Sequence, residues 1–273
     1  MLVAIDTAND PRLAPYMGVK ERDLLRASGQ FIVEGKVTLG RLVEASRFTV
    51  ESLFLAENRV ASVEDMLVRL DPSVPVYTAA QGVMDQVTGF HLHRGVLALA
   101  RREREVGCEE LVGSFGATTP LTLLALIGLS NHDNVGGCFR NAAALGADAV
   151  LLDAESCDPL YRKSIRVSAG TALSLPFARS GDGASITAAL ARAEIEAWAL
   201  TPSGGEPLPG LNPPKRLALV LGAEGPGLPK MLMDRCRRVS IPMAAGVDSL
   251  NVATAGAIAL AHVFSARAAT SRG

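Results

Sequence analysis

Short apolar runs alternate along the first hundred residues with stretches whose apolar residues recur at helical spacing. Short apolar runs bounded by polar residues are typical of strands, whereas a repeat of three to four residues is typical of helices. Strands are predicted at 31–34, 52–55, 74–77 and 95–100, and helices at 36–45 and 63–70. The pattern therefore predicts a small α/β unit at the start of the chain.

A second series begins with the continuous apolar run Leu121–Gly128, which is typical of a parallel strand buried on both faces. A helix is predicted at 137–145, where Gly146 ends it, and a strand at 149–152. Further helices are predicted at 186–193 and 252–266, and strands at 196–200 and 217–221. Strands and helices that alternate in this way predict an α/β domain with a parallel sheet.

The boundary between the two series is marked by the charge run Arg101–Glu105, after which no periodicity is evident up to Pro120. We therefore expect a first domain over 1–105, a linker over 106–118 and a second domain over 119–273.

Composition agrees with this fold class. Of 273 residues 48% are hydrophobic but only 4% aromatic, so aliphatic side chains must fill the cores, as in helices packed on a parallel sheet. The apolar run at 121–129 is far shorter than the roughly 20 residues that a bilayer requires, and the first residues do not read as a signal peptide. The four cysteines are scattered without metal-like spacing. We expect a cytoplasmic protein with reduced thiols.

Charge narrows the class of partner only slightly. The net charge is −1, and residues 1–117 hold 13 basic and 16 acidic residues, which gives −3. Binding to a nucleic acid would therefore depend on local basic patches. Basic clusters occur at 20–26, 101–104, 162–166 and 235–238.

A first candidate site follows the strand at 121–128, in the segment from Asn131 to Asn141. Ligands of open parallel sheets bind at the carboxyl ends of strands, which is where Asn134 and Arg140 lie. The planar guanidinium of Arg140 matches a phosphate or a carboxylate. Spacing alone leaves an alternative open, in which Asn134 caps the helix and Arg140 forms a surface ion pair.

A second candidate is the segment Leu219–Leu228, where a strand ends in three glycines around Glu224. It is neither a Walker A loop nor a dinucleotide-binding fingerprint. Glycines allow backbone groups to approach a ligand closely, and Glu224 could orient Arg140 or Asn134. The alternative is a tight turn with an exposed Glu.

A third candidate is Ile241–Ala253, a short strand and a polar turn that lead into the Ala-rich last helix. Ser249 and Asn251 are good N-cap residues, so capping is the simplest role for them. The many Ala and Gly residues here indicate very close backbone packing.

In this order the three segments resemble the SpoU (TrmH) family of RNA 2′-O-ribose methyltransferases, within the knotted SPOUT superfamily. The family's Asn and Arg, six residues apart, fall on Asn134 and Arg140. Its second motif falls on Leu221–Gly227 and its third on Ile241–Val252. The resemblance is strong over about residues 120–267. It is weaker in the first domain, which looks like the family's small ribosomal-protein-like α/β RNA-binding domain.

The resemblance implies a parallel-sheet α/β catalytic domain with a deep trefoil knot, an exception to the rule that chains do not thread their own loops. It implies S-adenosylmethionine bound in the knot, largely by backbone groups, and no metal. The cofactor-binding residues that it implies are Thr201, Gly222, Gly227, Ile241, Met243 and Leu250.

The implied reaction is methylation of a ribose 2′-hydroxyl in structured RNA, either rRNA or tRNA. The implied catalytic residues are Arg140, Asn134, Glu224, Ser249 and Asn251. Because a guanidinium loses its proton only above a pKa of roughly 12, we expect Arg140 to orient the substrate phosphate, with Glu224 fixing Arg140. The resemblance also implies a homodimer formed through the catalytic domain, and partners that include neither DNA nor a membrane.

A different class of function is an RNA-binding or ribosome-assembly protein that has the fold without the transfer activity. The presence of all five implied catalytic residues favours the enzyme. A dehydrogenase is disfavoured because the dinucleotide fingerprint is missing. We expect His132 and Asp133 in a loop or capping role, and His91 and His93 in a loop or on an RNA-facing surface.

Overall fold

The computed structural model describes residues 2–17, 25, 27–45, 47–202 and 204–270 and divides the chain into two compact units. The first comprises Met1–Arg104 with Leu160–Ser174, and the second Glu105–Pro159 with Leu175–Gly273. Helix α5 (Cys108–Gly113) lies in the segment expected to be a linker, and its Cys108 and Val112 are buried in the core of the second unit. Of the predicted basic clusters, Lys20, Arg22 and Arg26 lie outside the described residues.

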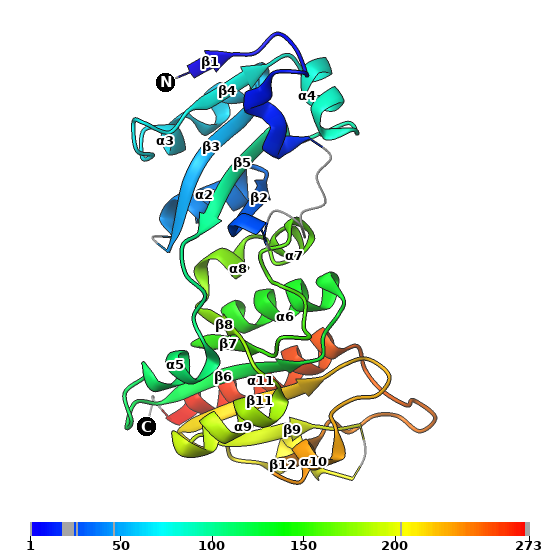
Figure 1. The fold of residues 1–273 in the computed structure, drawn as a ribbon. Helices are drawn as coiled ribbons and strands as arrows, with labels where there is room; N and C mark the ends of the chain where they lie inside the picture. Colours follow the sequence, from blue (N-terminus) through cyan, green and yellow to red (C-terminus); the bar gives the residue numbers. More distant parts are fainter. Residues whose placement is uncertain (1, 18–24, 26, 46, 203, 271–273) are drawn as a thin grey trace. The chain divides into compact units, whose positions relative to one another are not determined.

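The first unit is built on a mixed five-stranded sheet in the order β1-β4-β3-β5-β2 (Figure 1). Its strands are β1 (Leu2–Ala4), β2 (Gln30–Glu34), β3 (Phe48–Ala56), β4 (Val76–Ala79) and β5 (Val96–Arg102). Strand β5 runs antiparallel to both of its neighbours, whereas β4 runs parallel to both of its own. Residues 96–100 of β5 are buried, which explains the continuous apolar run there.

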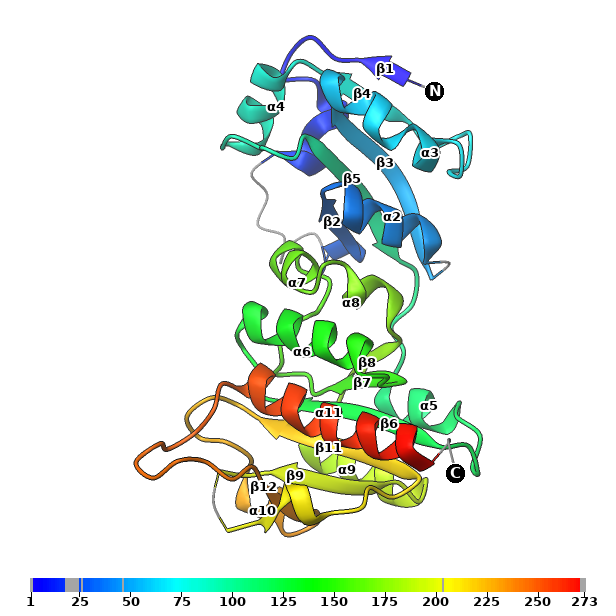
Figure 2. The same cartoon turned by 180° about the vertical axis from the view of Figure 1, so that it is seen from behind.

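Helices cover both faces of this sheet, and the two views together show which lies where (Figures 1 and 2). One face carries α2 (Lys36–Glu44) and α3 (Glu64–Leu67), and the other carries η1 (Pro11–Tyr16) and α4 (Gln81–Thr88). The same unit also contains η2 (Glu57–Val63), α7 (Arg162–Val167) and α8 (Thr171–Ser174). The small α/β unit that the pattern predicts is therefore present.

The second unit is built on a seven-stranded sheet in the order β10-β12-β9-β11-β6-β7-β8, in which every described pair of strands is parallel. Its strands are β6 (Leu121–Ile127), β7 (Ala149–Leu152), β8 (Phe177–Arg179), β9 (Glu196–Leu200), β10 (Glu206–Pro207), β11 (Arg216–Gly222) and β12 (Arg237–Ser240). The predicted parallel-sheet α/β domain is confirmed. Strand β6 is buried along its whole length, as the continuous apolar run predicts.

Helices again cover both faces, with α6 (His132–Ala144) and α11 (Val252–Thr270) on one and α5 and α9 (Gly183–Arg192) on the other (Figures 1 and 2). The short helices η3 (Leu208–Gly210) and α10 (Lys230–Met233) complete the unit.

The close backbone packing predicted for the last helix occurs between α6 and α11. A Cβ atom added at Gly137 would lie 3.0 Å from the Cβ of Ala253, and Asn141 Nδ2 donates to the Ala253 carbonyl at 2.8 Å. Small residues here allow the two helices to approach each other closely.

Two predicted boundaries are wrong. Helix α6 begins at His132 and not at residue 137, because the Asn131 side chain accepts a hydrogen bond from the Asp133 amide and caps the helix there. The strand expected at Ile241 ends one residue earlier, at Ser240. Polar residues form this strand because Arg237 pairs with Glu206 at 2.8 Å on the neighbouring β10.

Helix α11 is fixed at its far end by Arg267. The guanidinium Nη2 donates to the carbonyls of Leu121 and Lys215, both at 2.9 Å, and to that of Pro214 at 3.2 Å. These carbonyls lie where β6 and β11 begin, so one side chain holds the end of the helix to the amino ends of two central strands.

Candidate functional site

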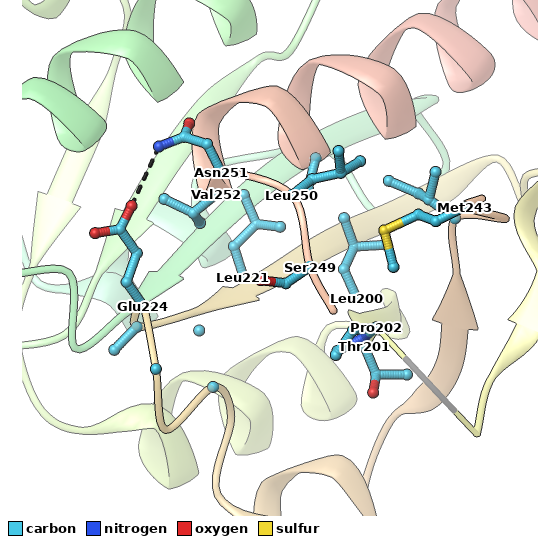
Figure 3. A pocket seen from close by; sticks show the side chains of 16 residues that line it. Leu200, Thr201, Pro202, Leu221, Glu224, Met243, Ser249, Leu250, Asn251 and Val252 are labelled. Carbon is cyan, nitrogen blue, oxygen red and sulfur yellow. Dashed lines mark hydrogen bonds between the residues drawn. The ribbon is translucent and has the colours of Figure 1, made fainter. Parts of the chain in front are cut away.

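A cavity of about 440 Å³ lies where the parallel strands β9, β11 and β12 reach their carboxyl ends (Figure 3). Ligands of open α/β sheets bind at this edge. The residues that line the cavity are Leu200, Thr201, Pro202, Leu221, Gly222, Ala223, Glu224, Gly225, Gly227, Ile241, Met243, Ser249, Leu250, Asn251, Val252 and Ala255. The second and third motifs therefore meet around one hollow.

All six residues predicted to bind the cofactor lie in this lining: Thr201, Gly222, Gly227, Ile241, Met243 and Leu250. Thr201 follows β9, and its amide donates to the Val239 carbonyl of β12 at 2.9 Å, which fixes the end of one strand against its neighbour. Among the described lining residues Glu224 is the one charged side chain. The hollow is therefore walled mainly by aliphatic side chains and backbone.

Three of the predicted catalytic residues form one hydrogen-bonded cluster. Asn134 Nδ2 donates to Glu224 Oε1 at 2.7 Å, and Asn251 Nδ2 lies 2.9 Å from Asn134 Oδ1 and 3.1 Å from Glu224 Oε1. Asn134 is buried, with 7% of its surface exposed. Figure 3 shows Asn251 at the start of α11 facing Glu224 across the mouth of the cavity. Residues from three separate segments are thus held together by their amide and carboxylate groups.

Asn251 both caps α11 and belongs to the cluster. Its Oδ1 accepts hydrogen bonds from the amides of Ala253 and Thr254, at 3.0 and 3.3 Å, while its Nδ2 serves the cluster. Capping fixes the side chain at the first turn of α11. Asn134, by contrast, does not cap α6, since Asn131 does so.

Arg140 lies apart from this cluster. Its side chain is exposed on α6, and among the described residues it neither lines the cavity nor forms a hydrogen bond or ion pair. The expectation that Glu224 fixes Arg140 is therefore wrong for this structure, because the Glu224 carboxylate binds the amides of Asn134 and Asn251. The alternative of a surface ion pair is not borne out either within the described chain.

Ser249 lines the cavity, but sequence reasoning missed several of its neighbours. Three of these, Leu221, Ala223 and Val252, are aliphatic residues within the second and third motifs, and their apolar character is equally typical of core residues. Leu200 and Pro202 flank Thr201. The only feature of the sequence that could have placed them in the cavity is their position at the end of a predicted strand. The missed lining residues are Leu200, Pro202, Leu221, Ala223, Gly225, Val252 and Ala255.

The loop between β6 and α6 is held by a buried carboxylate. Asp153 accepts from the Gly128 amide at 2.9 and 3.1 Å, and from the amide and hydroxyl of Ser156 at 2.9 and 2.6 Å. The Ser156 hydroxyl accepts in turn from the Leu129 amide at 3.0 Å. This network fixes the chain that leads to Asn131 and so to the first motif.

Metal ligation has no support in the described part of the chain, where no group of three or more His, Cys, Asp or Glu residues is arranged to hold an ion. His132 and Asp133 lie in the first turn of α6, where Asp133 is favourably placed at the positive end of the helix.

The loop from Gly222 to Leu228 leaves no room for a side chain at Gly222. A Cβ atom there would lie 2.5 Å from Gly227 C and from Leu228 N, closer than any real contact. The sequence indicates close approach of a ligand at this glycine, but the group that approaches it most closely is the backbone of the same motif. The loop from Gly222 to Leu228 therefore folds back on itself and forms one wall of the cavity.

We expect Gly222→Ala to weaken binding of the predicted cofactor at least tenfold, because the loop must move to admit even one methyl group. Gly210→Ala is the matched control, since its Cβ would meet nothing within 4 Å. Calorimetric titration of both folded variants with S-adenosylmethionine measures the effect. Equal affinities for the two variants would contradict this account of the loop.

Two comparisons identify relatives of the chain by sequence. The model of the SpoU rRNA Methylase family matches residues 122–261. An uncharacterized tRNA/rRNA methyltransferase of Mycobacterium bovis is 40% identical over 261 residues, which cover 92% of this chain and 88% of the relative.

Solved structures share the fold. A crystal structure of an RNA 2′-O ribose methyltransferase aligns with a TM-score of 0.81 at 23% identity, over 97% of this chain and all of the other. The SpoU methyltransferase AviRb of Streptomyces viridochromogenes, solved in complex with AdoMet, aligns with a TM-score of 0.80 at 21% identity, over 95% and 99% of the two chains. The family match spans the three motifs that build the cavity, and the chain belongs to the SpoU rRNA methylase family.

Proposed function

We propose that this protein transfers a methyl group from S-adenosylmethionine to a ribose 2′-hydroxyl of structured RNA, either rRNA or tRNA. The observation that carries the proposal is the cavity at the carboxyl edge of the sheet, with the Asn134–Glu224–Asn251 cluster at its mouth. Family membership supports RNA as the substrate, and the solved relative with bound AdoMet supports the cofactor.

The cavity suits this cofactor. Its volume of about 440 Å³ lies within the range of small-ligand sites. Leu221, Ile241 and Leu250 offer apolar surface for a purine, and the glycine loop offers backbone groups for its edge. The carboxylate of Glu224 provides the negative charge that a sulfonium favours. When bound, the cofactor would supply an electrophilic methyl group, to which the hydroxyl oxygen must be aligned.

In the proposed reaction, the chain's own residues contribute mainly position and charge. Asn134 and Asn251, held by Glu224, would fix the ribose beside the cavity, with Ser249 completing the wall. Arg140, exposed on α6, would bind the phosphate next to the target ribose with two parallel donors. A guanidinium keeps its proton at neutral pH and so cannot act as the base. The proton of the 2′-hydroxyl would therefore pass to the substrate phosphate or to water. Accurate positioning of this kind can supply much of the rate.

Methylation mapping tests the proposal. Ribosomal and transfer RNA from cells with and without the gene would be compared by alkaline hydrolysis, which a 2′-O-methyl group blocks. We expect one or a few sites to lose protection without the gene, and purified protein with S-adenosylmethionine to restore them. Methylation on a base, or no difference between the two RNAs, would refute it.

The competing candidate, an RNA-binding or assembly protein without transfer, predicts another result. Such a protein would bind RNA yet show no affinity for S-adenosylmethionine. The cluster at the mouth of the cavity favours the enzyme, since RNA binding alone needs no such arrangement beside a small-molecule hollow.

We also propose the family's other features for this chain: a trefoil knot in the second unit, RNA binding by the first unit, and a cytoplasmic location. The third motif runs from β12 through residues 241–251 into α11, which returns across the sheet to pack on α6. This return path supports the knot. A crystal structure in which 241–251 pass through a loop of the same unit would bear out the knot, and an unthreaded path would refute it.

A homodimer is proposed through α11. Over the described residues this is the one helix long and apolar enough to cross a membrane by length and composition, a test that core helices of soluble proteins also pass. Only 28% of Val252–Ala269 is buried, and Ile258 and Phe264 are 39% and 50% exposed. An apolar surface of this kind indicates a partner. We propose a second copy of the chain.

Light scattering is expected to give about twice 28.5 kDa for the wild type. Ile258→Asp would place a charge in the proposed interface, so this variant is expected to run as a monomer. Val68→Asp, at a position 78% exposed in the first unit, is the control and should remain a dimer. A wild type that is monomeric at micromolar concentration and fully active would refute the proposal.

A further inference from the structure

The loop from Gly89 to Gly95, between α4 and β5, is firmly anchored although much of it is exposed. Leu92 is 1% exposed; its amide donates to Asp85 Oδ1 at 3.1 Å, and its carbonyl accepts from Gln81 Nε2 at 3.2 Å. The Thr88 hydroxyl donates to the Phe90 carbonyl at 2.8 Å. The loop is thus a rigid platform on the first unit.

This platform presents aromatic and cationic side chains to solvent. Phe90 is 44% exposed, and His91, His93 and Arg94 are also exposed. The rings of His91 and His93 pack edge to face with centroids 4.5 Å apart. Arg59 joins them from η2, with Nη2 donating to the His93 carbonyl at 3.2 Å.

This loop and η2 bring two guanidinium groups to the surface, those of Arg94 and Arg59. Arg59 and Arg94 form no ion pair within the described chain, while the one acid in the loop's anchor, Asp85, is engaged by His91 at 2.6 Å. The hydrogen bond from His91 lowers the pKa of Asp85, which keeps that carboxylate ionised and occupied. In the same unit the guanidinium of Arg162 lies 5.2 Å from the centroid of the Phe90 ring.

We propose that the Phe90 surface, defined by Phe90, His91, His93, Arg94 and Arg59, binds an unpaired stretch of the RNA substrate. A base would stack on the Phe90 ring, and the phosphates on either side would lie against Arg59 and Arg94. This inference rests on the proposed function in taking RNA as the substrate, but it concerns recognition and not the transfer step.

The chemistry of the surface favours RNA over a protein or a lipid. Unpaired bases stack on aromatic rings, and the phosphate next to each base binds a guanidinium group. The Phe90 surface offers both kinds of group. A protein interface would be expected to bury a wider apolar area than one phenyl ring. The rigidity of the loop reduces the entropy lost when the ligand binds.

Binding of the full-length protein to total rRNA and to total tRNA, at several salt concentrations, tests the proposal. Phe90→Ala is expected to weaken binding by about 5- to 150-fold, the range for loss of one stacked base. The slope of log affinity against log salt should not change in this variant. Phe90→Tyr keeps the ring and should bind within about threefold of the wild type.

The arginines should show the opposite signature. Arg94→Ala and Arg59→Ala each remove one phosphate contact, so each is expected to lower the salt slope by roughly 0.7. Arg69→Ala is the matched control, because Arg69 is exposed in the same unit but pairs with Glu44 at 3.5 Å. All of these variants should bind S-adenosylmethionine as the wild type does.

The two proposals fail in different ways. If wild-type protein binds RNA through this surface but methylates none, the proposed function fails and this inference stands. If Phe90→Ala and Arg94→Ala bind both RNAs as tightly as Arg69→Ala, the surface does not recognise RNA and the inference is overturned, whatever the transfer activity.

Discussion

Replacing Arg140 by Ala is expected to reduce single-turnover methyl transfer by roughly a thousandfold, at the upper end of what one charge-stabilising donor supplies. The substitution should leave the protein otherwise intact. Arg140 is exposed and, within the described chain, has no intramolecular partner, so its loss should change the free energy of unfolding by no more than about 0.5 kcal/mol. Loss of activity can then be assigned to the missing contact with substrate.

Arg140→Lys separates charge from geometry. Lysine keeps the positive charge but lacks the planar pair of donors that binds a phosphate bidentately. If Arg140 orients the phosphate, the Lys variant should retain little of the transfer rate. Transfer would be measured on the RNA found by methylation mapping, alongside the affinity for S-adenosylmethionine, which should match the wild type in both variants.

Two results would change this view of Arg140. Near-normal turnover in the Ala variant would remove the residue from the mechanism. A Lys variant as fast as the wild type would show that positive charge alone is sufficient.

The second large effect is expected at Glu224. Removing its carboxylate by Glu224→Ala takes away the acceptor shared by Asn134 and Asn251, which are 2.7 and 3.1 Å from the same oxygen. Asn134 is buried and would keep a single partner in the cluster. Because a misplacement of about 1 Å near the reacting atoms can cost a hundredfold, we expect transfer to fall by about that factor or more.

Glu224→Gln tests whether the carboxylate acts through geometry or through charge. One oxygen accepts both hydrogen bonds, and a glutamine can present one oxygen in the same place. If Glu224 acts by positioning the two amides, the Gln variant should transfer within about tenfold of the wild type. A Gln variant as slow as Glu224→Ala would show instead that the negative charge is needed. Single-turnover rates and cofactor affinity, measured together, distinguish the two.

The central strands of the second unit were predictable because they are buried on both faces. Strands β6 and β11 read as continuous apolar runs for that reason alone. Strand β12 was expected at Ile241 but lies at Arg237–Ser240. The sequence does not predict a strand there, because Arg237 and Arg238 do not fit the apolar pattern of a strand. The partner of Arg237, Glu206, lies 31 residues away in the chain, and no local pattern reveals such a pair.

The residues that form the site could be predicted better than the hydrogen bonds between them. Parallel topology brings strand ends together, so the convergence of Asn134, Glu224 and Asn251 could be expected. The donor that forms a hydrogen bond with Glu224 could not be deduced from the sequence. Arg140 and Asn134 are six residues apart on one helix and so lie on different sides of it, and the sequence does not say which side faces Glu224. The same limit applies to Gly222, where the sequence indicates a close approach but not that the loop itself makes it.

Helix α11 carries a constraint on length. Asn251 holds its first turn at the carboxyl edge of the sheet, and Arg267 holds its last turns at the amino ends of β6 and β11. Seven residues of strand span roughly 23 Å, and the fifteen helical steps from residue 252 to 267 span about the same distance. The helix between its two anchors and the strand are thus equal in length. Inserting or deleting one residue between the two anchors would turn one end by about 100° relative to the other, so the number of residues between Asn251 and Arg267 is set by the sheet that the helix crosses.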